Sequence, residues 1–141
     1  LGDPETALAY FDEALNLEPN KQDLPSIYSY MGVALKDMGE YRRAMSELKK
    51  GEQLDQERTD IYNLMGFCHF KLKEHEAAIK NFKTVIGLDP SSAVDYAIIA
   101  SNYRDMGQPA KAIRYYEMAL TLDASIEFAR QNLAKLKSQE A

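Results

Sequence analysis

The sequence predicts an all-α fold built from repeated helix–turn–helix units. A pattern of aromatic and small residues returns every 34 positions along the chain. Within each repeat, the apolar residues follow the i, i+3, i+4, i+7 spacing of one helix stripe. No segment alternates apolar and polar residues over the length of a strand, so no sheet is expected.

Two sets of positions define the repeat register. The first set holds an aromatic, an apolar and a small residue: Tyr28, Met31 and Gly32; Tyr62, Met65 and Gly66; Tyr96, Ile99 and Ala100. The second set holds Ala44, Ala78 and Ala112. Three full units therefore cover 25–58, 59–92 and 93–126. Residues 1–24 supply the second helix of a partial unit and 127–141 a capping helix, so we expect a single domain over 1–141.

Helix boundaries are predicted from the residues that interrupt the apolar spacing. The first helix covers residues 3–17, with Pro4 in its first turn, where the missing N–H of proline is no loss. Gly39 and Gly107 separate the two helices of their units, because glycine readily takes the left-handed conformation that ends a helix. Pro109 marks the next helix start in the same way as Pro4. The last helix of the chain is amphipathic, as the cap of a repeat array should be.

Composition excludes several classes of function. Hydrophobic residues make up 45% and charged residues 28% of the chain, which is typical of a globular protein. The net charge of -5 argues against a nucleic-acid binder, which usually shows a concentrated basic excess. A single cysteine excludes an internal disulfide framework. No apolar run approaches the roughly 18 residues that a membrane helix requires.

The start of the chain bears on its compartment. Because the chain begins at Leu1 without a methionine, we expect an excerpt or a processed product of a longer protein. A cytoplasmic location is favoured. A periplasmic or membrane-tethered one stays open if an upstream signal has been removed.

The sequence contains no recognisable catalytic or metal constellation. Its glycines form neither of the phosphate-binding loop patterns GxxxxGK and GxGxxG. Cys68 and His69 are neighbours on one helix, so their side chains diverge by about 100° and suit a nucleophile–base pair poorly. The group Cys68, His69, Glu74 and His75 lacks the paired spacing of structural zinc ligands. We therefore expect no catalysis, no metal and no cofactor, with Cys68 and both histidines in structural roles.

On these repeat positions the sequence resembles the tetratricopeptide repeat family, whose units are 34-residue helix–turn–helix pairs. The resemblance covers essentially the whole chain and implies a right-handed α-solenoid. The sequence departs from the family pattern at Leu35 and His69, where an aromatic is common, and at Lys73, where a glycine is usual. Gly51 and Val85 stand in a slot that usually holds alanine.

The resemblance also implies a binding groove. In the family, the first helices of successive units line a concave surface that binds peptides or helices. An apolar stripe with a polar edge runs along these helices at Tyr30, Val33, Asn63, Leu64, Phe67, Phe70, Ile98, Ser101 and Arg104. Such a stripe is typical of a partner site. The alternative is that Leu64 and Phe67 pack between adjacent first helices.

One subfamily can be tested by its residues. Chaperone-adaptor members hold the carboxylates of a partner's C-terminus with lysine, asparagine and arginine side chains. The corresponding positions here are Ser29, Val33, Leu64, Val94 and Ile98. Since none of them matches, we expect the partner to offer an apolar or amphipathic protein segment rather than a chaperone tail.

The predicted function is thus a non-catalytic scaffold for protein–protein interaction. One alternative is a self-assembling structural module, in which the partly uncovered residues Leu8, Phe11 and Leu15 of the first helix dock into another copy. Residues 1–24 carry six acidic groups against one lysine, so this end holds the acidic surplus of the chain. Another alternative is a repeat segment of a larger multidomain protein.

Overall fold

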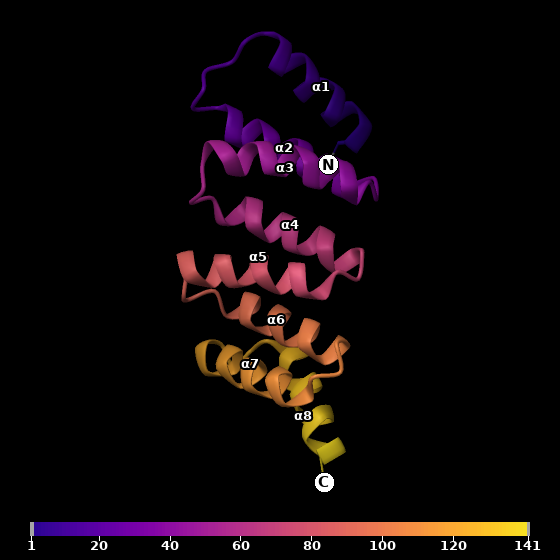
Figure 1. Cartoon of the computed structure of the whole chain (residues 1–141), viewed down its shortest axis with the longest axis vertical. Coiled ribbons are helices and arrows are strands. Elements are labelled where there is room, and N and C mark those ends of the chain that lie inside the picture. Colours follow the sequence, from indigo (N-terminus) through magenta and orange to yellow (C-terminus); the bar gives the residue numbers. More distant parts are fainter. Residues whose placement is uncertain (1, 141) are drawn as a thin grey trace. The chain divides into compact units, whose positions relative to one another are not determined.

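The computed structural model describes residues 2–140, which form eight α-helices and no strand (Figure 1). The prediction of an all-α fold is confirmed. The helices are α1 (Pro4–Asn16), α2 (Leu24–Asp37), α3 (Tyr41–Leu54), α4 (Thr59–Lys71), α5 (His75–Leu88), α6 (Ala93–Asp105), α7 (Pro109–Leu122) and α8 (Glu127–Glu140). Their contacts divide the chain into two compact units, Leu1–Leu72 with α1 to α4 and Lys73–Ala141 with α5 to α8.

The turns between paired helices require a left-handed residue. Gly39 has φ 77° and Gly107 has φ 72°, as predicted for residues that end a helix. The amides that follow them donate back into the helix, from Glu40 to the Leu35 carbonyl at 2.8 Å and from Gln108 to the Tyr103 carbonyl at 2.9 Å. Lys73, which stands in a usual glycine position, takes the same conformation with φ 60° at a cost of about 1 kcal/mol.

Close helix packing in the first unit depends on two glycines. Helix α2 packs against α1, α3 and α4, and α3 also packs against α4. A Cβ atom at Gly32 would lie 2.4 Å from Cδ2 of Leu48, and one at Gly51 would lie 2.8 Å from Cδ1 of Ile61. Both distances are shorter than a carbon contact allows, so only glycine permits these approaches. The core of this unit consists of Leu8, Met31, Ala34, Leu35, Ala44, Met45, Leu48, Ile61, Tyr62, Met65 and Cys68.

The second unit is built around two large aromatic side chains. Phe82 of α5 and Tyr116 of α7 occupy the same position of successive repeats, and both are buried. Ala78 of α5 and Ala112 of α7 are also buried, and α6 packs against both helices. Helix α8 packs against α7 through Ala129 and Leu136. The rest of this core consists of Ile79, Val85, Ala93, Ala97, Ile99, Ala100, Tyr103 and Ala119.

None of the helices within residues 2–140 combines the length and the apolar character needed to cross a membrane.

Candidate functional site

The predicted groove residues lie on the first helices of three repeats, and none of them is fully buried. In the first unit, Tyr30 of α2 is 54% exposed and Phe67 of α4 is 37% exposed. The other four groove residues of this unit are half-buried: Val33, Asn63, Leu64 and Phe70. The unit therefore presents two exposed rings beside partly covered apolar side chains.

Phe67 is held on the surface by its neighbours rather than by burial. The Lys36 ammonium lies 5.2 Å from the centre of its ring, and the Lys71 ammonium lies 5.5 Å from it. The Tyr41 ring meets it edge-on at 6.4 Å between centroids. Cation–π contacts at exposed sites each contribute about 0.5–1 kcal/mol, so the ring keeps a defined position while one part of it stays accessible. Two positive charges therefore flank the partly exposed Phe67 ring.

Tyr30 forms the other aromatic centre of this unit. Its ring stacks on Phe11 of α1 at 5.4 Å and an angle of 20°, and Phe11 in turn meets Tyr10 edge-on. Leu15 is half-buried, as is Phe11. Leu8, which we expected to be partly uncovered, is only 9% exposed, because α1 packs its inner face directly on α2. Packing against α2 thus buries Leu8 and leaves Phe11 and Leu15 half-buried.

A polar network joins the start of α4 to α2. Arg58 donates from Nε and Nη2 to the Asp60 carboxylate at 3.0 and 2.8 Å, and from Nη1 to the Ser26 hydroxyl at 2.7 Å. The buried Ser29 hydroxyl donates to Asp60 at 2.7 Å. The Arg58 hydrogen bond lowers the pKa of Asp60, and burial opposes this effect. The network therefore links the start of α4 to α2 through the two serine hydroxyls.

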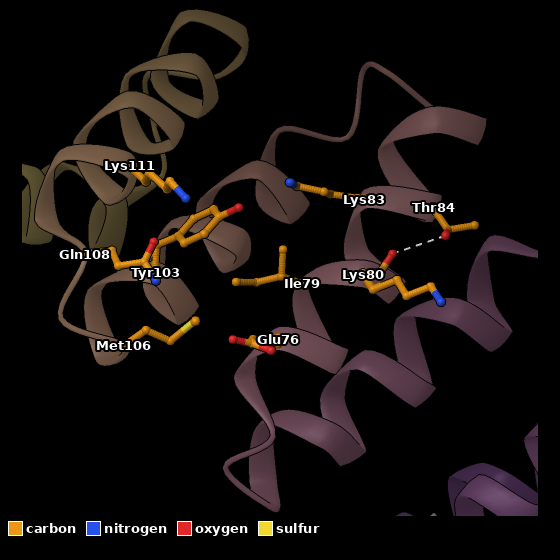
Figure 2. A pocket seen from close by; sticks show the side chains of 9 residues that line it. All are labelled: Glu76, Ile79, Lys80, Lys83, Thr84, Tyr103, Met106, Gln108 and Lys111. Atoms are coloured by element: carbon orange, nitrogen blue, oxygen red, sulfur yellow. Dashed lines mark hydrogen bonds between the residues drawn. The ribbon is translucent and has the colours of Figure 1, made fainter.

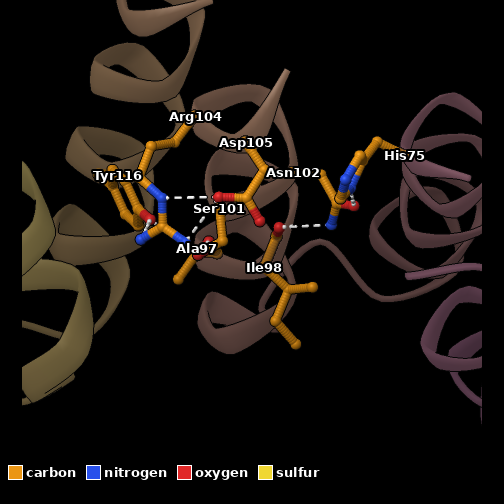
Figure 3. A network of polar contacts seen from close by, with 8 residues as sticks. All are labelled: His75, Ala97, Ile98, Ser101, Asn102, Arg104, Asp105 and Tyr116. Atoms are coloured by element: carbon orange, nitrogen blue, oxygen red, sulfur yellow. Dashed lines mark hydrogen bonds and ion pairs between the residues drawn. The ribbon is translucent and has the colours of Figure 1, made fainter. Parts of the chain in front are cut away.

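In the second unit, the predicted polar-edge residues Ser101 and Arg104 form hydrogen bonds with other residues of the chain (Figure 3). The Ser101 and Tyr116 hydroxyls lie 2.7 Å apart, and Ser101 also donates to the Ala97 carbonyl at 3.1 Å. The Arg104 guanidinium donates from Nε to Asp105 at 3.0 Å. Burial is the main cause that raises the pKa of Tyr116, which keeps its hydroxyl protonated. Ile98, Ser101 and Arg104 are all half-buried.

A buried amide that the sequence pattern did not indicate also organises α6. Asn102 is fully buried, and its Nδ2 donates to the Ile98 carbonyl at 2.9 Å. Its Oδ1 lies 2.9 Å from Nδ1 of His75, at the start of α5 (Figure 3). The equivalent positions of the preceding repeats hold Ala34 and Cys68. Asn102 is therefore a polar residue at a repeat position that otherwise holds a small apolar side chain, and this difference could have indicated a buried polar contact.

The residues considered for catalysis or metal binding are placed unfavourably for either. Cys68 is buried, and burial raises the pKa of its thiol to about 11, so the nucleophilic thiolate is scarce near neutral pH. His69 is half-buried on the same helix. Across residues 2–140, no three histidine, cysteine or acidic side chains gather closely enough to hold a metal ion.

The repeat pattern and the helix pairs agree with comparisons to protein families. The family model described as anaphase-promoting complex, cyclosome, subunit 3 matches residues 2–85, and a tetratricopeptide repeat model matches residues 96–126. The chain belongs to the tetratricopeptide repeat proteins. The resemblance predicted from the repeat positions is confirmed, and with it the solenoid class of fold.

Individual relatives match this chain over different lengths. A protein O-mannosyl-transferase of Caenorhabditis elegans is 32% identical over 77 residues, which are 55% of this chain but 11% of that protein. The crystal structure of MamA is similar with a TM-score of 0.90 and 26% identity, over 99% of this chain and 80% of MamA. The first tetratricopeptide domain of Spaghetti (RPAP3), bound to the HSP90 peptide SRMEEVD, shares the fold with a TM-score of 0.78 and 19% identity, over 85% of this chain and 94% of that domain.

Proposed function

We propose that this chain is a non-catalytic interaction scaffold that binds an apolar or amphipathic segment of another protein along the first helices of its repeats. The observation that carries the proposal is the exposure of Tyr30 and Phe67 on helices whose opposite sides form the core. A partner that covers these rings removes apolar surface from water, which contributes about 25 cal/mol for each Å² buried. Lys36 and Lys71 beside Phe67 provide a charged rim.

The nature of the partner is proposed from the side chains of the groove. The related fold of Spaghetti (RPAP3) accommodates an acidic HSP90 peptide. The positions with which chaperone adaptors hold such tails carry Ser29, Val33, Leu64, Val94 and Ile98 in this chain. Ser29 is buried and bound to Asp60, so it is not free to hold a ligand carboxylate. An apolar contact with Phe67, rather than a clamped terminal carboxylate, is therefore the proposed source of affinity.

The absence of catalysis is part of the same proposal. The buried Cys68 thiol, with its raised pKa, has little nucleophilic character. On α6, the Ser101 hydroxyl is hydrogen-bonded to Tyr116, and the Arg104 guanidinium is hydrogen-bonded to Asp105. These contacts suit a rigid recognition surface, in which side-chain positions are fixed before a partner binds.

A peptide-display selection tests the proposal with a matched pair of variants. Phe67→Glu places a charge in the groove, whereas Phe128→Glu makes the same change on α8 at a residue of almost equal exposure, 38% against 37%. Peptides selected on the unmodified chain should bind Phe67→Glu at least about tenfold more weakly, because a buried apolar contact is replaced by a charge. Binding to Phe128→Glu should be unchanged. Circular dichroism checks that both variants keep their helices.

Two results would count against this assignment. Selected peptides that bind Phe67→Glu as tightly as the unmodified chain would place the site elsewhere. Binding of the HSP90 peptide SRMEEVD as tight as that of the selected peptides would contradict the proposed preference for an apolar segment.

A further inference from the structure

The second unit contains a surface pocket of about 640 Å³ that is separate from the predicted groove (Figure 2). Residues of α5, of α6 and the turn after it, and of the start of α7 line the pocket. Its lining includes Lys80, Lys83 and Lys111, the Tyr103 ring, and the apolar side chains of Ile79 and Met106. We call this site the lysine pocket. Its volume lies in the range of about 300–1,000 Å³ that is common for binding sites.

The lysine pocket faces away from the groove residues of α6. At 3.6 residues per turn, Tyr103 in the pocket and Ser101 at the groove edge lie about 160° apart around this helix. A ligand of the lysine pocket would therefore contact a different face of α6 from a ligand of the groove.

Two lysines of the pocket are positioned by an aromatic side chain. The Lys83 ammonium of α5 lies 5.7 Å from the centre of the Tyr103 ring, and the Lys111 ammonium of α7 lies 5.4 Å from it. Figure 2 shows the Tyr103 ring between these two side chains. Lys83 also lies 5.9 Å from the Tyr115 ring. A hydrogen bond with Tyr103 raises the pKa of Lys83, which keeps its ammonium group charged.

The charges of the pocket are not balanced by the protein. Three lysines line it against a single carboxylate, that of Glu76. Within residues 2–140, Lys80, Lys83 and Lys111 form no ion pair with any carboxylate at 4 Å or less. Beneath these charges lie the buried Ile79 and the half-buried Met106. The pocket thus combines an unpaired positive rim with an apolar floor.

We propose that the lysine pocket binds an acidic segment of a partner protein, with carboxylates on Lys83 and Lys111 and one apolar side chain on Ile79 and Met106. Glu76 and Lys83 are seven residues apart on α5, which corresponds to about 10 Å along the helix. An extended chain covers this distance with about three residues. The proposed ligand is therefore a short segment that carries an apolar residue together with aspartate or glutamate.

Methionine-methyl NMR on the whole chain tests this assignment with defined peptides. The probe is the capped peptide GEEFEEG, and its isosteric control is GQQFQQG, which carries no charge. The Met106 methyl signal, assigned with Met106→Leu, should shift on addition of the probe and stay in place with the control. Replacement of Lys83 and Lys111 by glutamine should weaken probe binding about tenfold, since two charge pairs are lost.

Matched variants separate the lysine pocket from general electrostatics and from the groove. Replacement of the exposed Lys49 and Lys135 by glutamine changes the net charge equally and should leave binding unchanged. Phe67→Glu should leave it unchanged as well, even if it abolishes binding in the groove. The proposal is overturned by a Met106 signal that does not respond, by equal binding of GQQFQQG, or by a Lys83/Lys111 variant that binds as well as the unmodified chain.

Discussion

Gly32 and Gly87 are both helical glycines, but their surroundings predict opposite effects of adding a methyl group. The Cβ of Gly32→Ala would lie 2.4 Å from Leu48, which is fully buried and has no room to move away. Overpacking of this kind costs about 1–3 kcal/mol, which exceeds the gain of about 1 kcal/mol in helix propensity. Gly87→Ala meets nothing within 4 Å and should stabilise the fold by about 0.5–1 kcal/mol.

Urea unfolding followed by circular dichroism measures both effects. Gly87→Ala should have the highest unfolding free energy, the unmodified chain an intermediate one, and Gly32→Ala the lowest. A Gly32→Ala variant as stable as the unmodified chain would show that α2 and α3 are not packed as closely as the Gly32–Leu48 contact requires.

Some residues have conformations or contacts that the sequence does not predict. Lys73 departs from the usual glycine but still takes the left-handed conformation, because the turn geometry depends on the backbone. Asn102 and Ser101 form contacts that the repeat pattern does not predict, since their partners His75 and Tyr116 are specific to one repeat. Leu8, which we expected to be partly uncovered, is buried because α1 packs directly on α2.

At the scale of helices, the network of Arg58, Asp60 and Ser29 makes the link between α2 and α4 dependent on pH. Because the pKa of Asp60 is lowered in the folded protein, the unfolded chain binds more protons near pH 4. The stabilisation is therefore complete above the ordinary aspartate pKa of about 3.9 and is lost as the pH falls through the lower, folded value.

Asp60→Asn tests this sign. The unfolding free energy of the unmodified chain should exceed that of Asp60→Asn above about pH 5, and the difference should shrink as the pH falls below 3.9. Arg58→Gln removes the main hydrogen-bond donor and should reduce the same pH-dependent difference, while the Ser29 hydroxyl still donates to Asp60. Urea titrations at a series of pH values provide the measurement. A difference that grows towards acid pH would contradict the lowered pKa.

Helix identity was the most predictable feature at this scale. Helices are predicted from the apolar spacing, from Gly39 and Gly107 in the turns, and from Pro4 and Pro109 at helix starts. The structure contains helices at these places. Such signals are local and recur in each repeat, so they are readable from the chain alone. The charges around Phe67 are not, because Lys36 lies on α2 and approaches the ring only when α2 and α4 pack together.

For the molecule as a whole, the repeats account for the fold and only in part for the site. Family membership follows from a register that recurs along the chain. The predicted groove residues rest on that register, but only Tyr30 and Phe67 among them are exposed, and the other seven are half-buried. The lysine pocket was not predicted, because Lys83 and Lys111 come from two different helices and meet over Tyr103 only in the folded unit.

The central claim is that the first helices of the repeats bind a protein segment. Chemical-shift mapping of the labelled chain with a peptide from the display selection tests it most directly. The largest changes should fall on the exposed side chains of α2 and α4, with Tyr30 and Phe67 at their centre, while Phe128 of α8 stays unaffected. Changes centred on the second helices α3, α5 or α7, with Tyr30 and Phe67 unmoved, would contradict the account.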